Sequence, residues 1–284
     1  MPKRARVDVP AGRVTALYHK TGASSASMQR PLLLAASLVL RAHEGLEMQP
    51  ASPLSPRQVL LTDAEDLEAL GLRPGALREN IVLHGVSVGT LPSGTVLRFG
   101  SEVELRLTFP CEPCGHIVDS LAADVKAKLG DNPVKGLLGR RGVLATVVRG
   151  GDLAVDDECC VIDDVQYEPL SDTVKERVRW LLQRVPSGRV VTFMDVIGMV
   201  GAPSGFARAL PAYLKAWVRE GAVELPVHRM TDSRGGLLDK YVPGQRAMLE
   251  AEGVDVQVVE GQPCVDLSSF RWTPSHTEVF LQRV

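Results

Sequence analysis

The chain has 284 residues, of which 45% are hydrophobic and 23% are charged, and its formal net charge at pH 7 is -2. This composition excludes a collagen-like, fibrous or disordered chain, and the near-neutral charge excludes a global basic field that would attract nucleic acid. Any DNA binding must therefore come from a local cationic patch. A chain of this length is expected to form two domains of ordinary size.

The cysteine pattern and the N-terminal segment bear on the compartment. The five cysteines are an odd number, with one C-x-x-C and one adjacent pair, which is not a disulfide framework. The basic segment Met1–Val7 is followed by Asp8 and by no long apolar stretch, so no signal peptide is expected. The apolar run Pro31–Leu40 is too short to cross a bilayer and predicts a core strand. We therefore expect a cytoplasmic or nuclear protein without membrane contact.

The first half of the chain has the pattern of a β-rich domain. Short apolar runs separated by Gly and Pro predict many short strands, and these favour a barrel or a sandwich. The run Val103–Leu107 alternates apolar and charged residues, which predicts a half-buried strand with one wet face. Helical periodicity is expected at Asp63–Leu70 and His116–Leu129. The other predicted strands are Val59–Leu61, Ile81–Leu83, Thr95–Phe99, Gly142–Val148 and Glu158–Val165.

The pattern changes near Glu168. Ser171–Arg184 is amphipathic at helical spacing, and Ser171 or Asp172 is expected to cap that helix. The segments Met194–Val200 and Phe206–Glu220 then predict two helices joined by a Gly-bearing turn, the minimum for a helix-turn-helix.

A further helix is expected at Gln245–Glu252. The sequence therefore predicts two domains, residues 1–166 and 167–284. The last segment, Gln262–Val284, carries little pattern and is expected with the second domain.

The chemistry of the first half centres on Cys111-Glu112-Pro113-Cys114-Gly115-His116, directly after a predicted strand. A thiolate can act as a nucleophile, a soft metal ligand or a sulfur carrier. A structural zinc site would need a second pair of ligands at regular spacing, so no zinc is expected. A thioredoxin-like redox pair would need a βαβ context, and two ordinary buried thiols are a further alternative. The other cysteines, Cys159, Cys160 and Cys264, are interpreted as structural.

Four segments of this half, in order, resemble the MOSC family (molybdenum cofactor sulfurase C-terminal). They are Pro56-Arg57-Gln58-Val59-Leu60-Leu61, Leu77-Arg78-Glu79-Asn80-Ile81-Val82-Leu83-His84-Gly85, the stretch Leu91–Val103, and Arg141-Gly142-Val143-Leu144-Ala145 with Gly150-Gly151. The chain departs from the family pattern at Glu44-Gly45-Leu46-Glu47-Met48 and at Asp156-Asp157, where the family carries Gly-Asp elements.

The resemblance implies which residues do the chemistry. One cysteine of a P-C element is functional in the family, and the spacing from Thr108 favours Cys114, with Cys111 as a resolving or supporting thiol. Cys114 would carry a persulfide sulfur or ligate molybdenum, and the molybdenum cofactor is the implied cofactor. Arg57, Arg78 and Asn80 would hold that anionic cofactor.

The family also implies partners and an activity. A sulfur donor or a cofactor-pathway protein would be the partner, and an association with pyridoxal phosphate is also implied. Two enzyme classes stay open: a molybdenum-cofactor-dependent oxidoreductase and a sulfur transferase.

The second half resembles the alkylguanine-DNA alkyltransferases and their alkyltransferase-like relatives. The segments that carry this resemblance are Val185-Pro186-Ser187-Gly188-Arg189-Val190-Val191-Thr192-Phe193, Gly205-Phe206-Ala207-Arg208-Ala209-Leu210, Leu225-Pro226-Val227-His228-Arg229-Met230, Asp232-Ser233-Arg234-Gly235-Gly236, and Gln245–Gly253.

Val227 stands where the family has its alkyl-accepting cysteine, and valine has no nucleophile, so an active alkyltransferase is excluded. Recognition of double-stranded DNA can survive this loss. The resemblance implies that Arg208 takes the place of a flipped base. It also implies that the DNA-binding set comprises Phe193, Arg208, Lys215, His228 and Arg229.

Some features oppose DNA binding. His228 is open to a second interpretation, as a core histidine that holds its turn. Pro211 replaces a glycine of the family pattern, and Glu220 and Glu224 add negative charge near the expected DNA face.

The predicted fold class is α+β, a MOSC β-barrel-like domain followed by a small winged helix-turn-helix α/β domain. Three functions remain open at this point: a cofactor-binding or sulfur-carrying protein, a non-catalytic DNA-lesion-binding protein of DNA repair, and a scaffold that has lost both chemistries.

Overall fold

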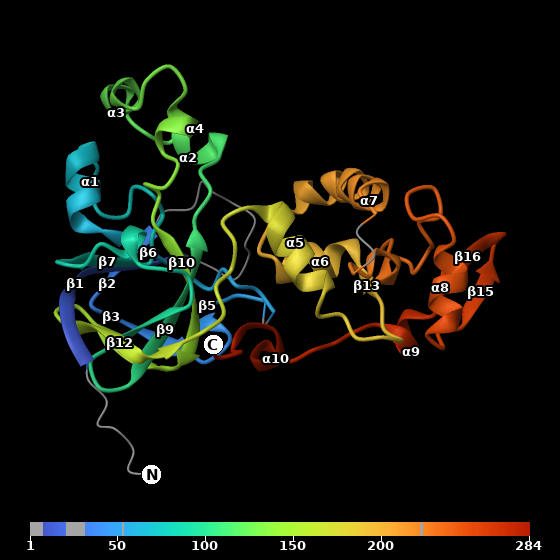
Figure 1. Cartoon of the computed structure of the whole chain (residues 1–284). Helices are drawn as coiled ribbons and strands as arrows, with labels where there is room; N and C mark the ends of the chain where they lie inside the picture. The colour runs from blue at the N-terminus through green and yellow to red at the C-terminus, as the bar shows by residue number, and fades with distance from the viewer. Residues whose placement is uncertain (1–7, 21–31, 53, 222–223) are drawn as a thin grey trace, which may run out of the picture. The chain divides into compact units, whose positions relative to one another are not determined.

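The computed structural model describes residues 8–20, 32–52, 54–221 and 224–284. The chain divides into two compact units, Met1–Leu170 with Phe280–Val284, and Ser171–Val279. Among the described residues, no helix is long and apolar enough to cross a membrane. The α+β fold class is confirmed, with strands concentrated in the first unit and helices in the second (Figure 1).

A closed barrel forms the centre of the first unit. The strands follow the order β12-β8-β9-β10-β6-β7-β1, and pairing of β1 with β12 closes the ring. All of these pairings are antiparallel except that of β6 with β7. The strands are β1 Asp8–Lys20, β2 Leu32–Ala35, β3 Ser37–Arg41, β4 Gly45–Leu46, β5 Gln49–Pro50, β6 Val59–Asp63, β7 Ile81–His84, β8 Thr95–Phe99, β9 Val103–Pro110, β10 Val143–Arg149, β11 Gly151–Ala154 and β12 Glu158–Gln166.

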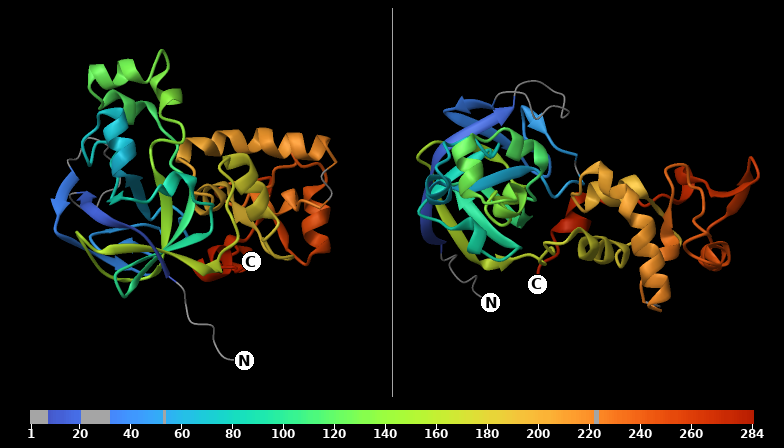
Figure 2. Two further views of the ribbon diagram at one scale, coloured as in Figure 1. Left: turned by 60° about the vertical axis from the view of Figure 1, so that its left-hand side comes forward. Right: turned by 90° about the horizontal axis from the view of Figure 1, so that it is seen from above.

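Short helices cover part of the barrel and lie together at one end of it (Figures 1 and 2). They are α1 Ala64–Leu70, the 3₁₀ helix η1 Val88–Thr90, α2 Gly115–Asp119, α3 Ala123–Lys128 and α4 Pro133–Gly136. One apolar cluster fills the barrel, and a second joins the outer face of the strands to these helices through Val82, Leu67 and Ile117. Strands covered on both faces are buried along their whole length.

Strand β9 corrects one sequence prediction. The alternation at Val103–Leu107 predicted a wet face, but Glu104 is 8% exposed and Arg106 is 0% exposed. The outer face of β9 is covered, because Arg106 donates from Nη2 to the Glu168 carbonyl at 2.5 Å and lies over the Tyr167 ring. In this strand, the charged residue Arg106 therefore indicates a buried polar contact and not a solvent-exposed face.

The prediction of one core strand at Pro31–Leu40 is also wrong. The described part of this run forms two strands, β2 and β3. Leu34 is 69% exposed, and β3 buries only alternate residues. Pro31 lies outside the described residues.

The C-terminal residues add to the first unit. The Glu168 N–H donates to the Gln282 carbonyl at 2.9 Å, and the Val284 N–H donates to the Gln166 carbonyl at 3.1 Å. The tail expected with the second domain thus has its last residues, Phe280–Val284, in the first unit.

The second unit has a helical part and a small hairpin (Figure 1). Strands β13 and β14 pair in parallel, and β15 and β16 form an antiparallel hairpin. Thr173, and neither Ser171 nor Asp172, caps α5 by accepting from the Glu176 N–H. The elements are α5 Val174–Leu182, β13 Val191–Thr192, α6 Phe193–Met199, η2 Ser204–Ala209, α7 Leu210–Arg219, η3 Val227–Arg229, β14 Met230–Thr231, α8 Gln245–Ala251, β15 Val256–Val259, β16 Gln262–Val265, α9 Leu267–Phe270 and α10 His276–Phe280.

The second helix of the helix-turn-helix is divided. The segment expected as one helix from Phe206 begins as the 3₁₀ helix η2, and α7 starts at Leu210. Pro211 explains the division, because proline has no N–H to donate and its ring clashes with the carbonyl four residues earlier. In the first turn of α7 the same proline is tolerated.

We predict that Gly142→Ala destabilises the first unit. Gly142 has a φ of +96°, and a Cβ there would lie 2.2 Å from the Leu61 carbonyl oxygen. The control is Gly139→Ala, where φ is +72° but no atom lies within 4 Å. The control should cost about 1 kcal/mol from backbone strain alone, and Gly142→Ala clearly more. Equal unfolding temperatures for the two variants in calorimetry would show that the close strand packing at Gly142 is wrong.

Candidate functional sites

The first candidate site lies where strand β9 ends and the chain enters the Cys111–Cys114 segment. Cys111 is buried, and its N–H donates to the Gly142 carbonyl at 2.8 Å. The Thr108 hydroxyl donates to the Leu144 and Pro56 carbonyls at 2.9 and 3.1 Å. These contacts fix the end of β9 against β10 and against the chain that leads into β6.

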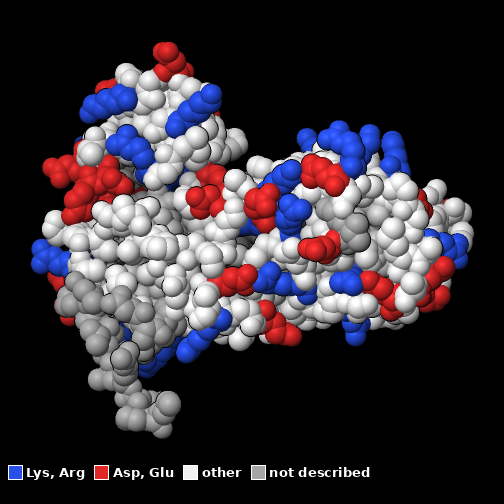
Figure 3. Space-filling model, in the orientation of Figure 1, with Lys and Arg blue, Asp and Glu red and all other residues white. Residues whose placement is uncertain are grey.

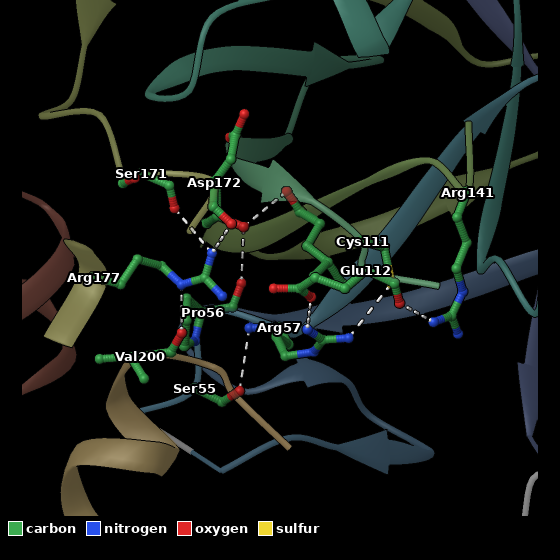
Figure 4. A network of polar contacts seen from close by, with 12 residues as sticks. Ser55, Pro56, Arg57, Cys111, Glu112, Arg141, Ser171, Asp172, Arg177 and Val200 are labelled. Carbon is green, nitrogen blue, oxygen red and sulfur yellow. Dashed lines mark hydrogen bonds and ion pairs between the residues drawn. The ribbon is translucent and has the colours of Figure 1, made fainter. Parts of the chain in front are cut away.

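Two arginines approach this segment from different strands (Figure 4). Arg57, just before β6, donates from Nη2 to Cys111 Sγ at 3.4 Å and from Nη1 to the Glu112 carboxylate at 2.7 Å. Arg141, just before β10, donates from Nη1 to the Glu112 carbonyl at 2.5 Å. Arg57 was a predicted site residue. Arg141 belongs to a segment that resembles the MOSC family, but no role was predicted for it.

Further positive charge surrounds the same thiol. Burial lowers the pKa of Lys20, at the end of β1, and the charges of Arg78, Arg141 and Arg57 lower it further, while Cys111 acts in the opposite direction. Lys20 was not predicted from the sequence, because nothing in its local pattern separates it from any lysine at the end of a strand.

Arg78 and Arg141 have buried N–H groups that lack an acceptor among the described residues. Arg78 Nε and Nη2 and Arg141 Nε are buried and find no hydrogen-bond partner in the described part of the chain. Burial lowers the pKa of Arg78, and the nearby Arg141 lowers it further. Arg78 also has a φ of +64°, in the left-handed region that non-glycine residues seldom adopt. Buried donors without acceptors are costly, so this arrangement favours an anion.

The adjacent carboxyl group does not cancel this charge. Glu79 is fully buried, one of its oxygens accepts from the Gly75 N–H, and the other has no partner among the described residues. Burial raises the pKa of Glu79 and so favours its neutral form. The cations therefore keep a net positive field.

Asn80 has a structural role that the sequence did not predict. Its Oδ1 accepts from the Leu60 N–H at 3.0 Å, and its Nδ2 donates to the Tyr18 carbonyl at 3.2 Å. The side chain thus ties β6 to β1, and both of its polar groups are used within the barrel.

Cys114 differs from Cys111 in its surroundings. It is half-buried, precedes α2 as its N-cap residue, and accepts at its carbonyl from the Ile117 N–H at 3.1 Å. Its side chain packs beside the apolar cluster under the helices. No group of three or more His, Cys, Asp or Glu residues that could hold a metal ion occurs in the part of the chain that the structure describes.

The second candidate site is a groove along helix α7. A cavity of ≈ 490 Å³ lies between this helix and the loop that carries Lys240 and Tyr241. Lys215, Arg219 and Lys240 line it with three exposed cations. In Figure 3, Lys and Arg side chains gather over α7. Lys215 was predicted to bind DNA, whereas Lys240 and Tyr241 were missed because the loop only meets α7 in the folded chain.

Arg208 and Phe193 lie within the helix-turn-helix. Arg208 is exposed on η2, and Phe193 is partly exposed as the first residue of α6. A capping box of Thr192 and Asp195 fixes the start of α6, and Arg271 pairs with the Asp195 carboxylate. Both predicted residues are therefore accessible, and the helix that begins at Phe193 is firmly capped.

His228 and Arg229, both predicted to contact DNA, bind a carboxylate within the second unit. His228 Nε2 lies 2.8 Å from Glu252 Oε1, and Arg229 donates to both oxygens of that carboxylate from Nε and Nη2. Arg229 Nη1 donates to the Val185 carbonyl at 2.6 Å. Burial acts to raise the pKa of Glu252, but the hydrogen bonds from Arg229, His228 and the Gly188 N–H outweigh it and lower this pKa to about 2.

The turn that holds Val227 is fixed from beneath. The Gln245 side chain is fully buried, and its Nε2 donates to the carbonyls of His228 and Met230 at 2.8 and 2.7 Å. Val227 is itself 8% exposed. The turn therefore keeps its shape without any contribution from a reactive side chain.

Comparisons with known proteins give one family match and a curated relative. The MOSC domain family matches residues 51–160. The DNA base-flipping protein of Escherichia coli (strain K12) is 35% identical over 103 residues, which are 36% of this chain and 75% of that protein.

Two solved structures each resemble a portion of the chain. The YuaD protein from Bacillus subtilis shares 19% identity at a TM-score of 0.42, covering 55% of this chain and 97% of that one. S. pombe Atl1, in complex with damaged DNA containing O6-carboxymethylguanine, shares 27% identity at a TM-score of 0.33, covering 37% of this chain and 98% of that one.

We predict that Glu252→Gln destabilises the second unit by roughly 2 kcal/mol at neutral pH, because a charged acceptor for Arg229 and His228 is lost. The pKa of Glu252 is lowered from 4.5 to about 2 on folding, so its contribution is full above pH 4.5 and disappears as the pH falls toward 2. Denaturant unfolding of both proteins across this range should show the difference shrinking toward acid. A difference that stays constant would contradict the assignment.

Proposed function

Since the chain carries a MOSC domain and belongs to the alkyltransferase-like family of DNA base-flipping proteins, we propose that its second unit binds duplex DNA at damaged bases without altering them chemically. The observation that carries this proposal is the cation-lined groove along α7. It supplies the local positive patch that a chain of net charge -2 requires.

The groove has the chemistry to hold an extrahelical nucleotide. Lys215, Arg219 and Lys240 can neutralise backbone phosphates, and the Tyr241 ring offers a face on which a base can stack. Arg208 is exposed on the preceding 3₁₀ helix and is not among the residues that line the groove. A guanidinium in this position can enter the base stack in place of the extruded base.

The same unit lacks the means to remove an alkyl group. Val227 has no nucleophile, and the His228 imidazole is already paired with Glu252 at 2.8 Å. Binding without transfer is therefore the function we propose, with a role in marking lesions for DNA repair.

We predict that Arg208→Ala and Lys215→Ala each weaken binding to a short duplex containing one O6-alkylguanine. Loss of one phosphate contact at Lys215 should reduce the slope of log K against log salt by about 1. Fluorescence anisotropy over a range of salt concentrations measures both quantities. Arg208→Ala should reduce the preference for the alkylated over the plain duplex, because that side chain acts at the vacated stack.

A matched control removes one exposed cation elsewhere in the unit. Arg246→Ala on α8 should bind as the wild type does, since Arg246 does not line the groove; it pairs with Glu250 and donates to the Val256 carbonyl. Equal affinity of the wild type for alkylated and plain duplex would rule out lesion recognition. Absence of binding to either duplex would favour a scaffold.

We also propose that the first unit binds an anionic cofactor of the molybdenum-cofactor type or carries sulfur on Cys114. The specific observation is the set of buried, unpartnered donors of Arg78 and Arg141 beside Lys20. A dianionic phosphate group fits such a set, because arginine binds oxygens in pairs. When bound, the cofactor would supply a molybdenum centre for oxygen or sulfur chemistry near the Cys114 thiol.

The residues of the chain would hold and orient that group. Lys20, Arg78 and Arg141 would bind its anionic end, and Arg57 would keep the Cys111–Glu112 segment in place through its two hydrogen bonds. A sulfur donor or a cofactor-pathway protein would be the partner that loads the site.

We predict that wild-type protein co-expressed with the cofactor pathway contains molybdenum, and that Arg78→Ala and Cys114→Ala lose it. Arg140→Ala is the control, since Arg140 is an exposed neighbour of Arg141. Metal analysis and pterin fluorescence of the purified proteins give the answer. A wild type without molybdenum but with a persulfide on Cys114 would select sulfur carriage, and a wild type with neither would refute both.

A further inference from the structure

The Cys111–Cys114 segment places two thiols in unlike surroundings with two residues between them, and both are free cysteines. Cys111 is 2% exposed and accepts a hydrogen bond from Arg57, whereas Cys114 is half-buried at the start of α2. One sulfur is thus within reach of solvent and partners, and the other is shielded beside a guanidinium.

We propose that Cys111 is a resolving thiol, which displaces hydrosulfide from a persulfide on Cys114, so that the first unit releases inorganic sulfide. This rests on the proposed sulfur-carrying role of Cys114. It goes further by naming the product, the leaving atom and the residue that expels it.

The step balances within the chain. The Cys111 thiolate attacks Sγ of Cys114, a bond forms between the two cysteine sulfurs, and the bond between Cys114 Sγ and the carried sulfur breaks. The electron pair leaves with the carried sulfur, which takes a proton from solvent as hydrosulfide. The carried sulfur is reduced and the two cysteines are oxidised to a disulfide. A dithiol reductant, supplied from outside, must reduce this disulfide before the next cycle.

Arg57 contacts the sulfur that attacks. Its Nη2 donates to Cys111 Sγ at 3.4 Å, which places a cationic donor directly beside this sulfur. The Glu112 carboxylate, 2.7 Å from Arg57 Nη1, holds the guanidinium in orientation. No equivalent donor contacts Cys114 Sγ in the described part of the chain.

The surrounding charges suit the departing group. Lys20 interacts electrostatically with Cys111 and lies near Arg78 and Arg141. An anion expelled from Cys114 therefore leaves into a field of positive charge, which lowers the barrier to its departure. The accessible position of Cys114 in turn allows a donor to load it.

The experiment uses the full chain, reduced and then loaded without oxygen by inorganic polysulfide, with the excess removed. Sulfide released over time is trapped by a bimane reagent, and peptide mass mapping locates persulfides and disulfides. The variants are Cys111→Ser, Cys114→Ser and Arg57→Gln, and Cys264→Ser is the control because Cys264 is a half-buried thiol in the other unit.

Wild type and Cys264→Ser should release about one sulfide per chain and form the Cys111–Cys114 disulfide without added thiol. Cys111→Ser should keep a persulfide on Cys114 and release sulfide only when a dithiol is added. Arg57→Gln should load normally and release roughly ten-fold more slowly.

Two failures are distinguishable. A Cys111→Ser variant that holds no persulfide on Cys114 contradicts the sulfur-carrying function itself. A Cys111→Ser variant that releases sulfide at the wild-type rate, or a wild type that keeps its persulfide, overturns the resolving role and leaves sulfur carriage intact.

Discussion

The pairing of β1 with both β7 and β12 is the constraint on which the first unit depends. It closes the barrel, and its antiparallel register with β7 sets Leu17 opposite Ile81, so that Lys20 lies near the residues that precede β7. The parallel pairing of β6 with β7 then brings the starts of those two strands to the same edge. Arg57 and Arg78 stand just before these starts, so hydrogen-bond register alone assembles cations from distant parts of the sequence.

This assembly has an electrostatic cost that the fold does not offset internally. Like charges held together in a poorly solvated region repel, and the lowered pKa values of Lys20 and Arg78 express that repulsion and their burial. The carboxyl group that could have balanced them, Glu79, is itself biased toward its neutral form. A site of this kind is less favourable empty than filled by an anion.

Local patterns in the sequence located the elements well, because strand and helix formation depend on neighbours in the chain. The strands around Val59, Ile81 and Val143 and the helix-turn-helix follow from spacing and turn residues alone. The wet face predicted for Val103–Leu107 was wrong, because burial of Arg106 depends on Glu168, a residue far along the chain.

The site residues also fall into those that local sequence motifs predict and those that only the folded chain brings together. Arg57 and Cys111 could be found from motifs, whereas Lys20 and Lys240 become site residues only when another segment folds against them. The same motif that indicated His228 and Arg229 could not reveal that Glu252 binds both of them. Sequence patterns thus identify polar residues that matter, but the partner of each is a tertiary property.

The network around Glu252 bears on position 227, where valine provides no nucleophile. Glu252 and Gln245 hold the Val227 turn through its backbone and its neighbouring side chains, and none of these contacts involves the side chain at position 227. These hydrogen bonds therefore do not depend on which side chain stands at position 227. Under the proposed function, binding of a damaged base and transfer of its alkyl group differ by one side chain, at position 227, while the frame that presents this position stays the same.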